Sequence, residues 1–266
     1  MLSSVVTVEG FYDEPMLYDV LHSPGTADEV RALIRIADGL GLDPKGPWLE
    51  PACGSGRYVR AAVARGIRIA AFDASEPMIA YARDRMRGVD HRLFRLDIMR
   101  MESFDVSRLA PGWQFQFAFN PINTVRHLET DQALQQHLER VHESLCPGGV
   151  YAIGLSVSLY EFEQPSEDVW EAARGALRVR QVVQYMPAPN KYDRGEQVHS
   201  VLHVTRPGGT STLPSAYTLR SYDRAQWLAA IERSPFSLLG CVDEGGRTMD
   251  PPELGYALWL LGKHVP

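Results

Sequence analysis

Apolar residues recur at helical spacing near the start of the chain. The apolar positions between residues 30 and 40 fall on one helical face, which predicts a helix that begins at Thr26 and stops at Gly41. Thr26 and Glu29 also have the Ser/Thr-x-x-Glu form of a capping box. We therefore expect one helix with a defined start and end.

Short apolar runs, separated by helical stretches, follow this helix. The runs predict strands at 48–52, 67–72, 93–96, 115–120 and 150–156, and the stretches predict helices near 57–65, 76–87 and 131–145. An alternation of strand and helix is typical of a parallel sheet, and right-handed crossovers then place helices on both of its faces. Ligands of such sheets bind where the loops diverge, at the carboxyl ends of the strands.

The pattern changes after residue 156. Residues 177–187, 196–205 and 216–222 alternate as antiparallel strands do, and a helix at 224–233 and strands at 236–242 and 256–261 close the chain. We therefore expect an α/β fold with a doubly wound, seven-stranded Rossmann-like sheet and an antiparallel β insertion after the fifth strand. The expected units are a cofactor-binding core with N-terminal lid helices at 1–155, the insertion at 156–222 and the closing elements at 223–266. The insertion would serve as a lid, a substrate platform or a dimer surface.

Composition narrows the class of protein. With 266 residues, of which 45% are hydrophobic and 23% charged, the chain has the make-up of a globular enzyme and not of a disordered or fibrous protein. A net charge of -6 disfavours nucleic acid as a partner. Cys53, Cys146 and Cys241 lie far apart, so neither a disulfide framework nor a zinc site is expected, and no metal is assigned. No secretory signal and no membrane span of ~18 apolar residues is evident. We expect a cytoplasmic monomer or homodimer without a membrane partner.

The most informative motif is WLEPACGSGR at residues 48–57, between a predicted strand and a predicted helix. Small residues at Ala52, Gly54 and Gly56 allow a tight turn and a close approach of the backbone to a ligand. The helix that follows presents free N–H groups and a partial positive charge. This loop is expected to hold a nucleotide-like or carboxylate-bearing ligand.

Two aspartates follow the next two predicted strands. Asp73 lies 17 residues after Gly56, where the carboxylate of a Rossmann-type unit accepts hydrogen bonds from ribose hydroxyls. Asp97 ends the third strand, where its side chain can accept from the exocyclic amine of adenine and the Ile98 N–H can donate to a ring nitrogen. Three strand ends therefore converge on one adenosine.

The order of these motifs resembles that of class I S-adenosylmethionine-dependent methyltransferases. The chain has ExxxGSG from Glu50, DxSxxM from Asp73 and LD at Asp97, then FNPINTVRHL and LCPGGV, and the resemblance covers roughly residues 10–155. The FYDEPMLYDVLH segment and the antiparallel insertion are similar to those of sugar-amine and glycine-type N-methyltransferases. The resemblance implies that S-adenosylmethionine (SAM) is the cofactor and that the protein transfers a methyl group to N or O of a small molecule.

The resemblance also implies which residues contact the cofactor. Glu50 would orient the Gly-rich loop or meet the methionine amine, Asp73 would bind the ribose hydroxyls, and Asp97 would hold the adenine edge. The chain departs from the family at Ala52, which stands where the family has its first glycine. The implied cofactor contacts are Tyr18, Glu50, Ala52, Cys53, Gly54, Gly56, Arg57, Asp73, Ala74, Ser75, Met78, Asp97, Ile98 and Asn120.

Methyl transfer depends mainly on positioning and on the protonation state of the acceptor, because a sulfonium already activates the methyl group. His127 follows the fourth predicted strand and is the candidate catalytic residue, which would take or steer the acceptor's proton. Tyr12 and Tyr18 would close over the cofactor. The candidate acceptor contacts are Tyr12, Asn123, Arg126, Tyr160, Tyr217, Arg220 and Tyr222.

Three other functions stay open at this point. The segment from Asn120 to Asn123 is similar to the Asn-Pro-Pro-aromatic loop of adenine methyltransferases, which would make the acceptor an amino group of nucleic acid or protein, but the aromatic residue is missing. A fold relative could also bind the cofactor without transferring a methyl group. A NAD-dependent dehydrogenase is disfavoured because the loop lacks the three-glycine GxGxxG spacing.

Overall fold

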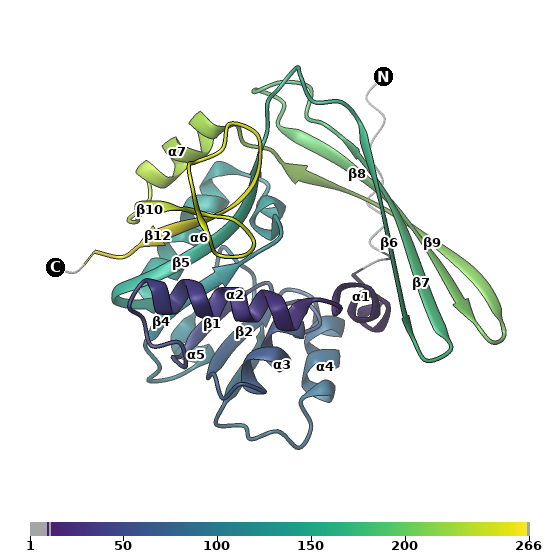
Figure 1. The fold of residues 1–266 in the computed structure, drawn as a ribbon, viewed down its shortest axis with the longest axis horizontal. Helices are drawn as coiled ribbons and strands as arrows, with labels where there is room; N and C mark the ends of the chain where they lie inside the picture. Colours follow the sequence, from purple (N-terminus) through teal and green to yellow (C-terminus); the bar gives the residue numbers. More distant parts are fainter. Residues whose placement is uncertain (1–9, 11, 265–266) are drawn as a thin grey trace.

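A computed structural model, which describes residues 10 and 12–264, contains two sheets. Figure 1 shows a core sheet flanked by helices and a second sheet that projects from one end of it. The core sheet has the order β11-β10-β12-β5-β4-β1-β2-β3. Its strands are β1 Trp48–Pro51, β2 Ile69–Asp73, β3 Phe94–Ile98, β4 Phe115–Asn120, β5 Leu145–Val157, β10 Ser237–Val242, β11 Thr248–Met249 and β12 Gly255–Gly262.

Five parallel strands and a closing hairpin form the core sheet. Strands β1 to β5 pair in parallel, and β12 runs antiparallel to both β5 and β10. This arrangement confirms the predicted doubly wound α/β fold. The prediction of seven strands is wrong by one, because a turn through Gly246 brings the two-residue strand β11 back onto β10.

Helices cover both faces of the core sheet. The helices of the described chain are α1 Pro15–His22, α2 Thr26–Gly39, α3 Arg57–Val63, α4 Glu76–Arg85, α5 Val106–Leu109, α6 Asp131–Ser144, α7 Arg224–Glu232 and the 3₁₀ turn η1 Thr124–His127, and all but α1 belong to the core. Successive strand residues point to opposite faces, so Trp48 packs with α2 and α3, while Leu49 packs with α6 and α7. Within the described part of the chain, no helix is long and apolar enough to cross a membrane.

The predicted capping box at the start of α2 is wrong. Gly25, with a φ of +84°, occupies the N-cap position, and Thr26 already lies inside the helix. The Thr26 hydroxyl instead accepts a hydrogen bond from Arg57 at 2.7 Å. The left-handed glycine turns the chain directly from α1 into α2, so no side-chain cap is used.

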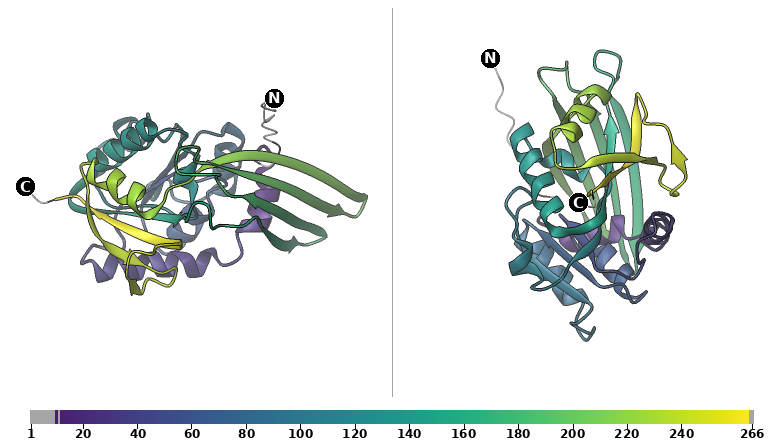
Figure 2. Two further views of the ribbon diagram at one scale, coloured as in Figure 1. Left: turned by 90° about the horizontal axis from the view of Figure 1, so that it is seen from above. Right: turned by 90° about the vertical axis from the view of Figure 1, so that its left-hand side faces the viewer.

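The second sheet is a four-stranded antiparallel meander, in agreement with the predicted insertion. Its strands are β6 Ser166–Arg174, β7 Leu177–Met186, β8 Gly195–Arg206 and β9 Gly209–Arg220, in that order across the sheet. The alternation pattern missed β6, because almost every residue of this edge strand is exposed and no apolar face marks it. Figure 2 shows α1 lying against the projecting sheet. This contact buries Leu17, Val20 and Leu21 of α1 with Val179, Leu202 and Val204 of the sheet.

Asp19 fixes α1 to both the core and the projecting sheet. Its fully buried carboxylate accepts hydrogen bonds from Ser55 at 2.9 Å and from Tyr81 at 2.9 Å in the core. It also accepts from Arg174 of β6 at 2.7 Å, and Arg60 of α3 forms a further ion pair with it. Tyr18, the next residue back along α1, is thereby held against the Gly-rich loop.

His137 makes the fold sensitive to acid. Its buried ring lies 3.0 Å from the Met101 carbonyl through Nδ1 and 2.7 Å from the Tyr151 hydroxyl through Nε2. Since a carbonyl only accepts, Nδ1 carries the proton and Nε2 accepts from Tyr151. Burial lowers the pKa of His137 to about 4.

The stability supplied by neutral His137 is expected to decline as the pH falls. An unfolded histidine, with a pKa near 6.5, binds its proton first, so stability is full above that pH and is lost between about 6.5 and 4. The loss is on the order of 3 kcal/mol. Urea unfolding of the wild type and of His137→Gln across this range would measure it, and the variant should show a shallower pH slope. Equal slopes would contradict the assignment.

Candidate active site

The Gly-rich loop turns tightly between β1 and α3. Ala52, Gly54 and Gly56 all have left-handed backbones, with φ of +53°, +52° and +71°. The Cys53 N–H donates to the Phe72 carbonyl at 2.9 Å, which ties the loop to β2. The tight turn predicted from small residues is therefore present, and its backbone is left-handed at the alanine as well as at the two glycines.

The backbone of Ala52 is strained in this turn, because the left-handed conformation is unfavourable for a residue with a Cβ. Ala52→Gly is expected to raise the free energy of unfolding by about 0.5–1 kcal/mol. Ligand affinity at the loop should stay within about twofold, since the backbone path already fits glycine. Chemical denaturation measures the free energy of unfolding, and calorimetry measures the affinity for the ligand. A destabilised variant would show that the Ala52 methyl group has a packing role.

Asp73 connects the end of β2 to this loop. Its carboxylate accepts from the Gly54 N–H at 2.7 Å and from the Ser75 N–H at 2.9 Å. Burial raises the pKa of Asp73, and these backbone N–H groups offset part of the rise. Ser75 then caps α4 by accepting from the Met78 N–H.

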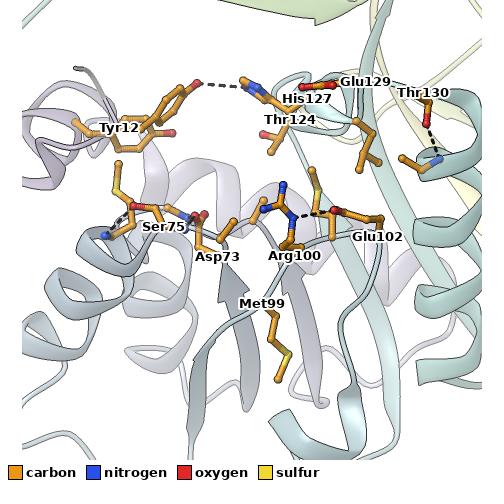
Figure 3. A pocket seen from close by; sticks show the side chains of 18 residues that line it. Tyr12, Asp73, Ser75, Met99, Arg100, Glu102, Thr124, His127, Glu129 and Thr130 are labelled. Atoms are coloured by element: carbon orange, nitrogen blue, oxygen red, sulfur yellow. Dashed lines mark hydrogen bonds and ion pairs between the residues drawn. The ribbon is translucent and has the colours of Figure 1, made fainter. Parts of the chain in front are cut away.

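A cavity of about 550 Å³ lies in front of these residues. Figure 3 shows Asp73 and Ser75 on one side of it and Tyr12 and His127 on the other. We call it the first cavity. The predicted cofactor contacts that line it are Tyr18, Ala52, Gly54, Asp73, Ala74, Ser75 and Met78.

Two buried side chains at adjacent strand ends have unused acceptor atoms. Asn120 donates through Nδ2 to the Pro51 carbonyl at 2.9 Å. Among the described residues, neither Asn120 Oδ1 nor Glu50 Oε2 has a hydrogen-bond partner. Burial, partly offset by Arg57, raises the pKa of Glu50 well above its usual range. Buried acceptors without donors are costly, so this position suits a ligand that carries an ammonium group.

Some predicted cofactor contacts lie elsewhere. Asp97 points to Arg83 on α4 and Arg108 on α5, with ion-pair distances of 3.5 Å and 3.3 Å, and Ile98 is exposed. Residues 99–102 line the first cavity in their place, because the Met99 N–H pairs with the Asp73 carbonyl and carries the chain across the strand ends.

Arg57 also faces away from the first cavity. It is buried, and it bonds Glu29 on α2 at 2.6 Å and the Tyr58 hydroxyl at 2.7 Å. Its role in the structure is therefore to join α3 to α2. Cys53 and Gly56 contribute to the loop but not to the cavity lining.

A second cavity, of about 900 Å³, lies between the core and the projecting sheet. The two cavities share four lining residues, which are Tyr12, Tyr18, Thr124 and His127. They therefore meet at these side chains. The predicted acceptor contacts that line the second cavity are Tyr12, Asn123, Arg126 and Tyr217.

Aromatic rings surround the place where the cavities meet, which we call the junction. The Tyr12 ring centre lies 6.1 Å from that of Tyr18, 5.8 Å from that of His127 and 5.9 Å from that of Tyr217. The Tyr12 hydroxyl is 3.3 Å from His127 Nε2. Burial and the charge of Arg126 lower the pKa of His127 to about 4, so its ring is neutral at pH 7.

Comparison with known proteins agrees with this geometry. Residues 49–149 match the family model described as a methyltransferase domain. This segment is a methyltransferase domain. The match extends from β1 through the Gly-rich loop into β5, so it includes the Gly-rich loop and strands β2 to β4. No curated protein sequence matches the chain.

Solved structures share the fold of the methyltransferase domain and of the whole chain. The CcbJ methyltransferase from Streptomyces caelestis is 17% identical, with a TM-score of 0.71, over 97% of this chain and 99% of that one. The sugar N-methyltransferase KedS8 from a Streptoalloteichus species is 16% identical, with a TM-score of 0.68, over 92% and 90%. SAM-bound CalS10, an amino pentose methyltransferase from Micromonospora echinaspora, is 18% identical, with a TM-score of 0.64, over 90% and 91%. The predicted class I methyltransferase fold is confirmed.

Arg126 and Asn123 hold the junction of the methyltransferase domain in place. Arg126 is buried, pairs with Glu196 of β8 at 3.2 Å and donates to the Arg220 carbonyl at 2.9 Å. Asn123 accepts from the Ser156 N–H at 2.6 Å and donates to the Ser156 hydroxyl at 3.0 Å. These contacts fix η1, and with it His127, against β5 and the projecting sheet.

Three predicted acceptor contacts lie outside both cavities. Tyr160 donates to Gln226 at 2.9 Å, and Arg220 bonds Asp131 and the Glu129 carbonyl. Tyr222 is buried against Trp227, with ring centres 5.5 Å apart. Tyr160 lies where the chain leaves β5, and Arg220 and Tyr222 lie where it returns from β9, so their side chains pack on α6 and α7 and not in either cavity.

The projecting sheet adds polar residues to the second cavity that were not predicted from the sequence. Gln181 and Glu196 are buried residues of β7 and β8. Each lies on the same strand face as the buried valines of its own strand. The sequence signal for these cavity residues was a polar residue at a position where the strand alternation predicts an apolar one. Glu163 and Trp170 also line this cavity, but their segment has no such pattern.

Proposed function

We propose that this protein transfers the methyl group of SAM to an amino nitrogen of a small molecule. The observation that carries the proposal is the meeting of two cavities at Tyr12, Tyr18, Thr124 and His127. One cavity has the Gly-rich loop and Asp73 of the methyltransferase domain, and the other is walled by the insertion. A transfer reaction needs this arrangement, because donor and acceptor must meet at one point.

The residues of the first cavity fit SAM. Asp73 would accept from the ribose hydroxyls. Glu50 and Asn120 are buried and do not line the first cavity, but their unused acceptor atoms lie at the strand ends next to the Gly-rich loop and would bind the methionine ammonium. The left-handed Gly-rich loop would allow the ligand to approach the backbone closely. The relative CalS10 was solved with SAM bound, which supports the same ligand here.

The junction would position the reacting groups. Bound SAM supplies a methyl group on a positively charged sulfur, already activated for displacement. The rings of Tyr12, Tyr18 and Tyr217 would exclude water and present faces and hydroxyl oxygens that stabilise positive charge. His127, neutral at pH 7, would accept a hydrogen bond from the acceptor and orient its lone pair.

An amine suits this junction better than a hydroxyl. A hydroxyl acceptor must lose its proton to a base, and His127, with a pKa of about 4, is too weak for that task. A neutral amine already has its lone pair and needs only orientation. KedS8 is a sugar N-methyltransferase and CalS10 acts on an amino pentose, which supports nitrogen as the acceptor atom.

The insertion at 156–222 would act as the acceptor platform. Its strands supply Gln181, Tyr185, Glu196 and Tyr217 to the second cavity, whereas the core supplies the first. A lid formed by α1 and the turn before it would close over both cavities, through Tyr18 of α1 and Tyr12 of the turn.

A matched pair of acceptors tests the proposal. The protein, SAM and either 4-phenylbenzylamine or biphenyl-4-methanol would be incubated, and S-adenosylhomocysteine (SAH) release and methylated product would be measured. We expect methylation of the amine and at least tenfold less of the alcohol. Faster methylation of the alcohol would contradict nitrogen transfer, and failure to bind SAM by calorimetry would contradict the proposed function itself.

A further inference from the structure

A buried hydrogen-bond acceptor without a donor among the described residues lies at the second cavity. Gln181 is 1% exposed, lies on β7 and lines this cavity. Its Nε2 donates to the Ser200 hydroxyl at 2.7 Å, but its Oε1 has no hydrogen-bond partner among the described residues. A buried amide oxygen without a donor costs free energy unless a ligand supplies an N–H or O–H group.

The charges around Gln181 are predominantly negative. Five carboxylates line the second cavity, and Arg126 is the one arginine or lysine among the described residues that do so. Arg126 is engaged by Glu196 at 3.2 Å and by Ser221 at 3.0 Å. Burial lowers the pKa of His22 and His127 to about 4, so neither adds positive charge at pH 7. The carboxylates are those of Glu29, Glu163, Asp168, Glu196 and Glu244, of which Glu29 pairs with Arg57 and Glu196 with Arg126.

Apolar side chains surround the mouth of the same cavity. Phe162 is 74% exposed, and Ile122, Trp170 and Leu254 are also exposed although each is large and apolar. They come from the β4–η1 loop, the insertion and the segment before β12, so three separate parts of the chain converge there. Exposed apolar groups that gather at a cavity mouth are typical of a ligand-binding surface.

We propose that the acceptor is a cationic amine carried on a bulky apolar body and bears no phosphate or carboxylate. This inference rests on the proposed function and specifies its substrate class. Glu163 and Gln181 Oε1 receive the cationic head beside the Glu196–Arg126 ion pair and accept its N–H groups, and Phe162 and Trp170 cover the apolar body. An acceptor with an added phosphate meets the same carboxylates at close range and is repelled.

The proton balance is compatible with this charge pattern. The ammonium is attracted by the carboxylates, and its nitrogen gives up one proton to solvent before it reaches the neutral junction of tyrosines and His127. The nitrogen lone pair then forms the new C–N bond, the S–C bond breaks, and its electron pair stays on sulfur. The methylated nitrogen leaves with the positive charge.

Calorimetry with matched probes tests the inference independently of turnover. Three probes share a biphenyl body and differ in their heads, which are cationic in 4-phenylbenzylamine, neutral in biphenyl-4-methanol and anionic in biphenyl-4-carboxylate. Glucosamine serves as a cationic amine without an apolar body. Each would be titrated into the protein with and without saturating SAH. We expect 4-phenylbenzylamine to bind at least tenfold more tightly than the other three.

Two isosteric variants locate the charge effect. Glu163→Gln removes a carboxylate from the cavity, and Glu161→Gln removes one from a neighbouring position that does not line it. We expect Glu163→Gln to weaken binding of 4-phenylbenzylamine at least threefold and to reduce its preference over the carboxylate, with Glu161→Gln unchanged. Phe162→Ser should weaken the biphenyl probes but not glucosamine.

The outcomes separate this inference from the proposed function. Carboxylate binding as tight as amine binding, or equal effects of Glu163→Gln and Glu161→Gln, would overturn the inference even if amines are methylated. The expected binding order without any methyl transfer would support the cavity's specificity and contradict the proposed reaction.

Discussion

Replacing Asp73 by alanine is expected to weaken SAM binding at least tenfold. The substitution removes the carboxylate that would accept from the ribose and also frees the Gly54 and Ser75 N–H groups, which now bond it at 2.7 Å and 2.9 Å. Hydrogen bonds to a charged group contribute about 1.5–3 kcal/mol, and a tenfold change in affinity corresponds to about 1.4 kcal/mol. Calorimetric titration of SAM and SAH into both proteins measures the effect.

Asp97→Ala is the matched control for Asp73→Ala. Both aspartates end neighbouring strands, but Asp97 pairs with Arg83 and Arg108 and does not line the first cavity. We therefore expect the Asp97 variant to change SAM affinity less than about threefold, which is under ~0.7 kcal/mol. A larger loss at Asp97 than at Asp73 would favour the adenine contact predicted from sequence over the placement in the structure.

Gly56→Ala is expected to destabilise the fold by about 2–4 kcal/mol. Gly56 has a φ of +71°, and a Cβ added there would lie 2.9 Å from the Ala82 Cβ of α4. The left-handed backbone costs about 1 kcal/mol, and overpacking against α4 costs about 1–3 kcal/mol more. Because the same loop lines the first cavity, SAM affinity should fall as well. Urea unfolding measures the change.

Gly66→Ala separates strain from overpacking. Gly66 has a similar φ of +77°, but a Cβ added there meets nothing within 4 Å among the described residues. We expect a loss of about 1 kcal/mol, from backbone strain alone. Similar losses in the two glycine variants would mean that α4 yields to the added methyl group and that the close contact at Ala82 is unimportant.

The parallel core was predictable from sequence because its physical signal is local. Buried parallel strands appear in the sequence as short apolar runs. The small residues of the Gly-rich loop likewise indicate a tight turn. Edge strand β6 was missed since both of its faces are largely exposed. The capping box at Thr26 failed because the hydroxyl is used by Arg57, a residue 31 positions away.

The direction of individual side chains could not be obtained from the strand pattern alone. Asp73 and Asp97 both end strands, yet one faces the first cavity and the other faces the arginines of α4 and α5. Tyr12 and His127 were each singled out in the sequence, but their contact joins positions 115 residues apart and depends on how α1 docks. Gln181 belongs to an insertion without a motif, so only its buried place in β7 reveals it.

A crystal structure of the protein with SAH bound tests the central claim most directly. We predict that the ribose hydroxyls bond Asp73, that the methionine ammonium lies against Glu50 and Asn120, and that the sulfur faces the junction formed by Tyr12, Tyr18 and His127. SAH in the first cavity with its sulfur turned away from the second cavity, or with its ribose away from Asp73, would contradict the account.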